Sequence, residues 1–573
     1  MKIVITFALL VAGLPAFSQQ LRFETSNGTE SATYDELISA FKSFTSDPRF
    51  RIREMGMTDA GLPLHLLTID NQSDHEPTSW HSKKNAVILV NNGIHPGEPD
   101  GMDASLMLAR DIRSGKVKIP NGVSIALIPV YNVGGMLNRN STTRVSQNGP
   151  KEYGFRGNSR NYDLNRDFTK NDSREARTFA GIFHYVQPHV LVDNHVSDGA
   201  DFQHTMTLIT TQYDKLGGKP GEFLKNTFEP EIYAAMKRRN WDVIPYVDFG
   251  NNELHKGIRM FMDPPRYSSG YAALFNTIGF MPETHMLKPY KERVKATYDQ
   301  MLSFLEVCGK LRQEIVSTKE AADREMIERK EFPLSWKPDS SQTGSFTFKG
   351  YEKDTVTSDA TGLPRMRYNK SRPFTTTIPY YNHFIPASSV SAPLAYVIPQ
   401  GWHNVIDILR LNKVRMKAFE KDTVIRVRSY RIESLKSFTM AYEGHHKNYS
   451  VRTRDTVEQM RFRKGDILIE MNQPANRYLV EMLEPGGDDS FFSWNFFDGI
   501  MQQKEGYTDY RWEELAAEVL KKDPALRKAL EEKKAADREF AGNSSAILDF
   551  IYRNSAFYEP SHRKYPVYRI EDQ

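Results

Sequence analysis

The chain contains almost no cysteine. Cys308 is the single cysteine among 573 residues, which excludes a disulfide within the chain and a cluster of cysteine thiolates around a metal. Cys308 lies in an apolar helical pattern, so we expect it to be a buried packing residue. Any metal site must therefore use histidine, aspartate or glutamate side chains.

The sequence also lacks a charge excess of either sign. Its 76 basic and 72 acidic residues leave a formal net charge of +4, which is nearly balanced for this length. A nucleic-acid-binding chain or a strongly cationic membrane binder would show a marked basic excess, and we expect neither partner. Hydrophobic residues form 39% of the chain, enough to build folded cores, and the length requires more than one of them.

Long hydrophobic runs are absent except at residues 1–18. Lys2 is followed by an apolar run from residue 3 to residue 17 and by a small-x-small pattern that ends at Ser18. This order is typical of a cleaved signal peptide, so we expect a secreted or periplasmic protein. We expect no transmembrane segment after cleavage, because no later run reaches the roughly 20 apolar residues that a span needs.

Short apolar runs alternate with helical patterns between residues 86 and 284. The runs at residues 86–90, 123–130, 189–192 and 277–281 are predicted strands, and residues 103–112 and 174–185 are predicted helices. Strands that alternate with helices indicate an α/β fold, in which helices flank a largely parallel sheet. The predicted α/β domain covers residues 19–315.

The sequence changes character after residue 311. Residues 316–344 are predicted to be a charged helix and linker. Residues 345–485 contain short β-branched or aromatic runs, such as 395–398, 423–429 and 478–482, and are expected to form a β-rich, sandwich-like domain. Residues 486–573 are expected to be a helical C-terminal extension with solvated Lys and Glu faces.

His95 and Glu98 follow the first predicted strand of the α/β domain directly. Open α/β sheets bind their ligands at the carboxyl ends of such strands. A turn rich in Gly and Pro can direct a histidine and a glutamate three residues apart toward one point, where they offer zinc a nitrogen and a carboxylate. The spacing alone is a weak signal, and the strand-end position strengthens it.

His195 and Glu283 also follow apolar runs that are predicted strands. A catalytic zinc needs a third protein ligand and one open position for water, and His195 is the candidate ligand. A carboxylate beside an activated water can accept its proton and return it to the leaving amine. Glu283 is the candidate for that role.

Residues 161–168 bring Asp163, Asn165 and Arg166 close together in the sequence. Metal-binding histidines usually donate their second ring nitrogen to a carboxylate or a carbonyl, and Asp163 is a candidate acceptor. Arg166 with Asn165 could bind a carboxylate through two hydrogen bonds. The competing role for Arg166 is an ion pair with Asp163 or Asp167.

Taken in order, these residues resemble the carboxypeptidase A-like zinc metallocarboxypeptidase family. The family is marked by a His-x-x-Glu loop, an Asp-x-Asn-Arg segment, a distal strand-end His and a late strand-end Glu. The matching positions are His95 with Glu98, Asp163 with Asn165 and Arg166, His195, and Glu283. The resemblance covers about residues 35–310, and it implies a mixed eight-stranded sheet flanked by helices and one zinc ion per chain.

The resemblance also implies a role for each site residue. The implied zinc ligands are His95, Glu98 and His195, and the implied hydrogen-bond partner of His95 is Asp163. The implied anchors of the substrate's terminal carboxylate are Asn165 and Arg166. The implied general base is Glu283. An arginine that stabilises the oxyanion is expected at Arg156, with Arg144 as the alternative. The phenol that closes over the substrate is expected at Tyr267 rather than Tyr271.

The chain departs from the better-known members of that family in two respects. No obvious removable pro-segment follows residue 18, and a long β-rich and helical extension follows the α/β domain. The expected activity is hydrolysis of C-terminal peptide bonds. Relatives with the same metal site imply two alternatives, a cell-wall amidopeptidase that acts on muropeptides and an amino-acid deacylase.

Two further classes of protein have less support. A non-catalytic glycan- or peptide-binding protein is expected to have lost a metal ligand or the late Glu, and neither is missing. A serine hydrolase would carry a Gly-x-Ser-x-Gly elbow, which the sequence lacks. We therefore expect an enzyme.

Overall fold

The computed structural model describes residues 20–249 and 254–571, so the expected signal peptide lies outside the described residues. The chain divides into two compact units. The first unit comprises Met1–Asp263, Tyr267–Ala322 and Pro338–Ile385, and the second comprises Pro264–Arg266, Asp323–Lys337 and Pro386–Gln573. Within the described part of the chain, no helix has the length and apolar character that crossing a membrane demands.

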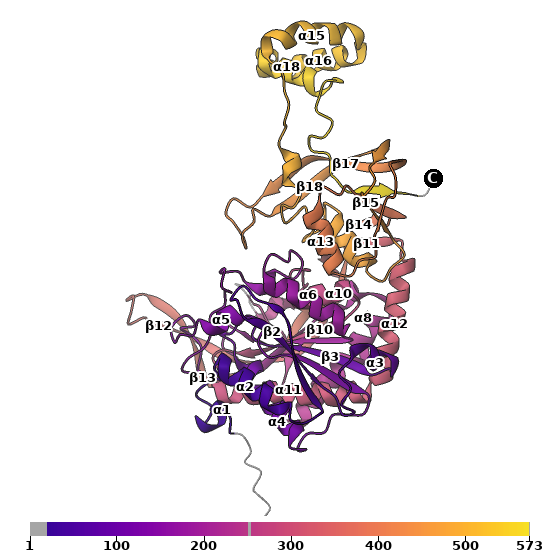
Figure 1. Ribbon diagram of the computed structural model, residues 1–573. Helices are drawn as coiled ribbons and strands as arrows, with labels where there is room; N and C mark the ends of the chain where they lie inside the picture. Colours follow the sequence, from indigo (N-terminus) through magenta and orange to yellow (C-terminus); the bar gives the residue numbers. More distant parts are fainter. Residues whose placement is uncertain (1–19, 250–253, 572–573) are drawn as a thin grey trace, which may run out of the picture. The chain divides into compact units, whose positions relative to one another are not determined.

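A mixed sheet forms the centre of the first unit (Figure 1). Its order is β1 (Phe50–Met57), β2 (Pro63–Ile69), β4 (Val123–Ile128), β3 (Ala86–Asn91), β5 (Val190–Asp193), β10 (Ile278–His285), β7 (Met206–Thr210) and β8 (Ile244–Pro245). A short strand, β6 (His195–Ser197), follows β5 after Asn194 and also pairs with β10. The predicted mixed eight-stranded sheet is confirmed, with β6 as an additional short strand.

The central strands β4, β3, β5 and β10 run parallel, and β1 and β2 pair antiparallel with their neighbours. β7 pairs antiparallel with β10 and parallel with β8. Every side chain of β3, β4 and β5 is buried, as expected of strands covered on both faces. In Figure 1, α2 (Tyr34–Phe44), α4 (Asp100–Arg113) and α11 (Tyr290–Lys310) lie on one side of the sheet, and α6 (Arg174–Val186) and α10 (Ser268–Leu274) lie on the other. Cys308 is buried in α11, as expected.

Short helices connect the strands of the first unit. They are α1 (Arg22–Thr25), α3 (Pro77–Ser82), α5 (Val133–Leu137), η1 (Leu164–Arg166), α7 (Tyr213–Leu216), α8 (Gly218–Phe223), η2 (Leu224–Phe228), α9 (Glu229–Arg238) and η3 (Leu254–Lys256). A two-residue strand, β9 (Ile258–Arg259), follows η3. The long helix α12 (Arg312–Glu328) comes after α11 and forms where the charged helix was predicted.

A long hairpin also belongs to the first unit. It consists of β12 (Gly344–Thr357) and β13 (Pro364–Tyr381), which pair antiparallel and extend as an arm in Figure 1. β13 also pairs with β9. The sequence predicted a β-rich accessory domain at residues 345–485, and this hairpin lies at its start. Alternating Thr and aromatic residues suit a long two-stranded ribbon.

The second unit contains a six-stranded sheet. Its order is β16 (Lys417–Ala418), β19 (Ile467–Glu470), β15 (Ala395–Ile398), β20 (Tyr568–Ile570), β17 (Thr423–Ser437) and β18 (Asn448–Phe462). The unit also contains the strand pair β11 (Glu331–Pro338) and β14 (Phe384–Ser391), with α13 (His403–Leu411) and α14 (Asn476–Leu483). The strand predicted at residues 478–482 is wrong, because these residues lie in α14. A short apolar run does not by itself distinguish a strand from a buried helix.

Helices dominate the C-terminal residues, as predicted. After η4 (Asp498–Met501) come α15 (Asp509–Lys522), α16 (Pro524–Ala536), α17 (Arg538–Ala541) and α18 (Ser544–Arg553). These helices share a small core that includes Trp512, Leu530 and Tyr552. The chain then returns to the six-stranded sheet as β20. The predicted domain limits stay a prediction, because grouping by contacts does not test which segments fold alone.

Candidate metal centre and substrate cavity

A tight turn at the end of β3 brings His95 and Glu98 together. The Glu98 amide donates to the His95 carbonyl oxygen over 2.8 Å, which closes the turn before α4 begins at Asp100. The two side chains are each 3% exposed, and His95 Nδ1 lies 3.3 Å from Glu98 Oε1. The turn thus presents a nitrogen and a carboxylate to one point.

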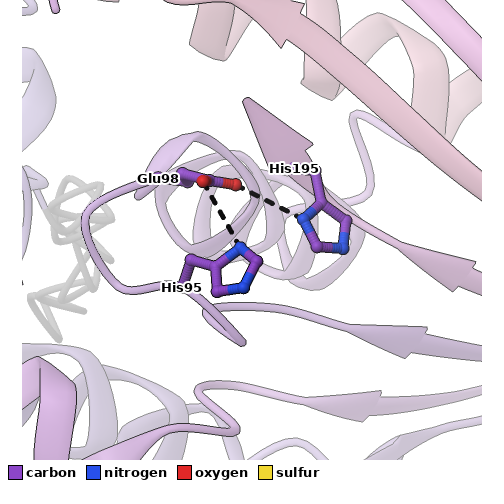
Figure 2. Close-up of side chains that lie close together, drawn as sticks. All are labelled: His95, Glu98 and His195. Atoms are coloured by element: carbon purple, nitrogen blue, oxygen red, sulfur yellow. Dashed lines mark ion pairs between the residues drawn. The ribbon is translucent and has the colours of Figure 1, made fainter. Parts of the chain in front are cut away.

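His195 reaches the same point from the start of β6. Its Nδ1 lies 3.3 Å from Glu98 Oε2, and its ring centroid is 5.1 Å from that of His95. Figure 2 shows Glu98 between the two imidazoles, facing one nitrogen of each. The Val196 amide donates to Glu98 Oε2 over 2.8 Å and helps to hold the carboxylate in place. The three side chains could hold a metal ion.

Each histidine directs its other ring nitrogen to an aspartate. His95 Nε2 donates to Asp163 Oδ1 over 2.9 Å, and His195 Nε2 donates to Asp193 Oδ2 over 3.1 Å. These bonds assign the proton to Nε2 in both rings, which leaves the Nδ1 lone pairs to bind a metal. Asp193 was missed in the sequence, although its position two residues before His195 is a usable signal.

Arg144 crosses the metal-binding turn and contacts Glu98. Its Nη1 donates to Glu98 Oε1 over 3.0 Å, and its Nε donates to Gln147 Oε1 over 2.6 Å. Gly97 makes room for this crossing, because a Cβ there would lie 2.7 Å from Arg144 Cδ. Burial opposes ionisation of Glu98, but His95 and Arg144 outweigh it and lower the pKa of Glu98 well below its usual range.

Arg156 also lies close to His95, with 3.4 Å between its Nη1 and His95 Nδ1, and its side chain is about half exposed. Its Nε donates to Asp163 Oδ2 over 3.0 Å, and its Nη1 lies 3.6 Å from Glu98 Oε1. Burial opposes its charge, but Asp163 and Glu98 raise the pKa of Arg156. Both candidate arginines therefore reach Glu98.

Glu283 lies on β10, directly opposite His195 in the parallel pair. Burial raises the pKa of Glu283 to about 8, with Glu98 adding to the rise and His195 and Arg156 opposing it. A divalent cation at the neighbouring group favours the ionised carboxylate. A carboxylate in this position can accept and return a proton.

Asn165 and Arg166 lie in the short helix η1 on the other side of the cavity. Asn165 Oδ1 accepts a bond from the Ser268 amide over 3.3 Å, which directs the Nδ2 donors elsewhere. The Arg166 guanidinium carbon lies 4.2 Å from the centre of the Tyr267 ring. Tyr267 thus orients the Arg166 guanidinium, and the Ser268 amide orients the Asn165 side chain. The cationic guanidinium and the neutral side-chain amide are hydrogen-bond donors that could bind a carboxylate.

These residues line one cavity of about 370 Å³ in the first unit. Predicted residues on its wall are His95, Glu98, Arg144, Arg156, Asn165, Arg166, His195, Tyr267 and Glu283. Asp163 contacts His95 from outside the cavity lining, and Tyr271 is fully buried against the rings of Phe179 and Phe183 in α6. Sequence reasoning missed the rest of the wall, which consists of Val196, Ser197, Asp198, Ile209, Tyr246, Phe261 and Met281.

The donor set suits zinc. Two imidazole nitrogens and a carboxylate, all within 4.8 Å of one another, match the three-ligand pattern that leaves a position for water. Burial opposes a charge on His195, but Asp193 and Glu98 raise its pKa, so the surroundings favour positive charge. Fold and site together are therefore those expected of a metal-dependent hydrolase built on a mixed sheet.

Comparison with known proteins agrees with this class. Residues 38–213 match a family model described as zinc carboxypeptidase. This part of the chain is similar to the zinc carboxypeptidase family, which confirms the resemblance seen in the sequence motifs. Zinc is the metal of that family, and its members are hydrolases. The match ends before Glu283, whose role stays a prediction.

Solved structures with a similar fold include three carboxypeptidases. A metallo-carboxypeptidase from Burkholderia cenocepacia shares 14% identity over 48% of this chain and 69% of its own, with a TM-score of 0.35. Carboxypeptidase A from Helicoverpa armigera shares 14% over 53% and 77%, with a TM-score of 0.37. A metallo-carboxypeptidase from Pseudomonas aeruginosa, solved with (2-guanidinoethylmercapto)succinic acid, shares 13% over 50% and 70%, with a TM-score of 0.37. A search of curated protein sequences found no match.

Proposed function

We propose that this protein is a zinc carboxypeptidase that removes residues from the C-termini of peptides. The observation that carries the proposal is the convergence, in one cavity, of a His-Glu-His group, a buried carboxylate and an Asn-Arg pair. In this proposal His95, Glu98 and His195 hold the zinc. When bound there, zinc supplies a Lewis acid that polarises the scissile carbonyl and acidifies water.

The neighbouring residues supply proton transfer and charge stabilisation. Glu283 accepts a proton from the attacking water at a carboxylate oxygen and returns it to the leaving amine. Arg156 is charged and close to the metal-binding group, so it can stabilise the negative charge that develops on the carbonyl oxygen. Arg144 reaches the same group, and its bond to Glu98 favours a positioning role.

The Asn165 and Arg166 pair gives the proposed enzyme its exopeptidase character. Both residues line the cavity, and a terminal carboxylate is the substrate group that such a pair binds best. Tyr267 stacks on Arg166 and can cover a bound substrate residue. Peptides are therefore the proposed substrates, with muropeptides and acylated amino acids as the alternatives.

The decisive experiment compares peptides with free and amidated C-termini. Amidation removes the charge of the terminal carboxylate, and a hydrogen bond to a charged group is worth about 1.5–3 kcal/mol. We expect kcat/KM to fall about ten- to a hundredfold on amidation for the wild type, and the difference to shrink in Arg166→Ala. Equal cleavage of both peptides by the wild type would favour the amidase alternatives.

Metal analysis accompanies that assay. His95→Ala and His195→Ala should each lower the bound zinc, because a three-ligand site loses much of its chelation with one ligand. His403→Ala is the matched control, since His403 is exposed at the start of α13 in the second unit. Full zinc occupancy in both site variants would contradict the ligand assignment.

Export is a separate proposal. It is supported by the charged, apolar and small-residue order of residues 1–18. Expression of the full sequence followed by mass analysis of the N-terminus tests it, with cleavage after Ser18 as the expected result. An intact N-terminus on the exported or cell-bound protein would contradict cleavage.

A further inference from the structure

The base of the β12–β13 hairpin is part of the core of the first unit. Phe348, Ile378 and Tyr380 are 3%, 1% and 7% exposed, as expected of core residues rather than of a surface ribbon. The Phe348 ring packs against Phe202, with their centroids 6.0 Å apart. The base of the hairpin therefore packs against residues that lie within the predicted catalytic domain, 19–315.

The same base extends toward the cavity through β9. Tyr380 and Tyr381 of β13 pair in parallel with Ile258 and Arg259, and the Met260 amide donates to the Tyr381 carbonyl oxygen over 3.0 Å. The next residue is Phe261, which lines the cavity. The hairpin thus fixes the backbone up to the residue that forms the wall.

Phe261 in turn supports Tyr267. Their rings pack edge to face with centroids 5.2 Å apart, and both rings line the cavity. Tyr267 also stacks on Arg166, one of the proposed carboxylate anchors. A continuous series of contacts therefore connects β13, through Phe261, to the substrate side of the cavity.

The hairpin also holds the segment that follows β6. Gln203 donates from its amide to the Lys349 carbonyl oxygen over 2.9 Å, and from Nε2 to the carbonyl oxygens of Gly350 and Phe374 over 2.9 and 3.1 Å. Ser197, the last residue of β6, and Asp198, the first residue of this segment, both line the cavity. Two separate parts of the cavity wall are thus attached to one hairpin.

Gly257, just before β9, packs closely against the backbone of β13. Its φ is +70°, a conformation that favours glycine, and a Cβ there would lie 2.4 Å from the Pro379 carbonyl oxygen. Because that atom belongs to the β13 backbone, any larger residue must displace β9 from the hairpin. A single methyl group therefore tests the contact.

We infer that the base of the β12–β13 hairpin is a positioning element, which holds Phe261 and Tyr267 as the wall of the substrate cavity. Its kinetic consequences rest on the proposed carboxypeptidase function, whereas its structural consequence does not. The distal arm takes no part, because residues around its tip, such as Leu363 and Met366, are 66% and 50% exposed.

Gly257→Ala and Phe261→Ala are the test variants, measured as full-length proteins with zinc bound. A wall that binds the substrate equally in ground and transition states affects KM rather than kcat. We expect KM for a susceptible peptide to rise about tenfold in each variant, with kcat changed less than about threefold and zinc content unchanged. Phe261→Tyr keeps the ring and should restore KM.

Two controls separate the possible failures. Replacing the arm from Thr355 to Met366 with a two-residue turn should leave KM and kcat unchanged. Amide hydrogen exchange of residues 254–263 should rise in Gly257→Ala but not in the arm variant, whatever the substrate is. If the wild type cleaves no peptide, the proposed function fails while the exchange experiment still tests the hairpin.

The inference would be overturned by unchanged exchange at residues 254–263 in Gly257→Ala, or by unchanged KM in a folded Phe261→Ala. If Gly257→Ala does not fold, Phe261→Ala decides, because it leaves the β9–β13 pairing untouched. A loss of thermal stability without a change in KM would assign the hairpin a purely structural role and would likewise contradict the inference.

Discussion

The metal-binding edge and the substrate wall of the same cavity are built in different ways. The edge comes from strands that are neighbours in one sheet: Asn91 pairs with Asp193, and His195 pairs with Glu283. The register of the sheet therefore fixes how the metal-binding turn, the second histidine and the proposed base face one another. Few long-range contacts outside the sheet are needed.

The wall, by contrast, comes from segments that join the sheet only indirectly. Tyr246, Phe261 and Tyr267 lie between β8 and β10, and Phe261 is held through a hairpin more than 80 residues further along the sequence, at Gly344–Tyr381. The sequences of such loops vary more easily than those of strands, and loops often carry the residues that determine binding preference. In the proposed function, the sheet edge therefore supplies the reaction chemistry and the wall sets the substrate preference.

The largest effect is expected from the edge, at Glu283. Glu283→Gln keeps the size of the side chain but cannot accept a proton at neutral pH. We expect kcat to fall by about 10²- to 10⁴-fold with little change in KM, because general acid–base groups contribute on that scale. Stopped assays on zinc-loaded protein measure both constants.

The control for that variant is Glu222→Gln, since Glu222 is an exposed glutamate on α8 of the same unit. Zinc content and melting temperature should match the wild type in both proteins. Near-normal kcat in Glu283→Gln with zinc in place would show that another group is the base, and it would remove the chemical contrast between edge and wall.

The same contrast explains how much could be predicted from the sequence. The predicted strands at 86–90, 123–130, 189–192 and 277–281 correspond to β3, β4, β5 and β10, because fully buried parallel strands are continuous apolar runs. Side chains that follow such runs lie at one sheet edge, so the convergence of His95, Glu98 and His195 could be predicted from the sequence.

The wall could not be recognised in this way. Ile209, Tyr246 and Phe261 are ordinary apolar or aromatic residues, and nothing in their spacing distinguishes a cavity wall from a core. The hairpin lies in the region predicted to be β-rich, but its contact with the cavity wall depends on packing between residues far apart in sequence. The strand predicted at residues 478–482 was wrong for a related reason, because a short apolar segment fits a helix as well as a strand.

A smaller effect is expected behind the edge, where the two histidines have different carboxylate partners. Asp163 also pairs with Arg156, whereas Asp193 is fully buried and accepts its second bond from the neutral Asn91 amide over 2.9 Å. Asp193→Asn should weaken zinc binding by about 10- to 100-fold, as removal of such a partner typically does. Competition with a chromophoric chelator measures the affinity.

Asp163→Asn provides the comparison for that variant. It should weaken zinc binding to a similar degree and also lower kcat at saturating zinc, because it releases Arg156. Asp111→Asn is the control, since Asp111 is a buried aspartate on α4 that pairs with Arg110 and Lys116, away from the metal-binding group. Unchanged zinc affinity in Asp193→Asn would mean that the sheet alone orients His195.

The smallest effect is expected in the wall itself, at Ile209. Ile209 and Met281 lie opposite each other across β7 and β10, both line the cavity, and they are 7% and 2% exposed. Ile209→Val removes one methylene group, which is worth about 0.8 kcal/mol when it is buried against a ligand, or about fourfold in kcat/KM. We expect that loss for peptides ending in a large apolar residue and less than about twofold for peptides ending in alanine, whose side chain is too short to reach the wall. Parallel assays of the two peptides measure the difference, and zinc content should stay constant. An equal loss of kcat/KM on both peptides would mean that Ile209 affects the reaction chemistry and not the substrate preference. The contrast between the edge and the wall would then not hold for β7.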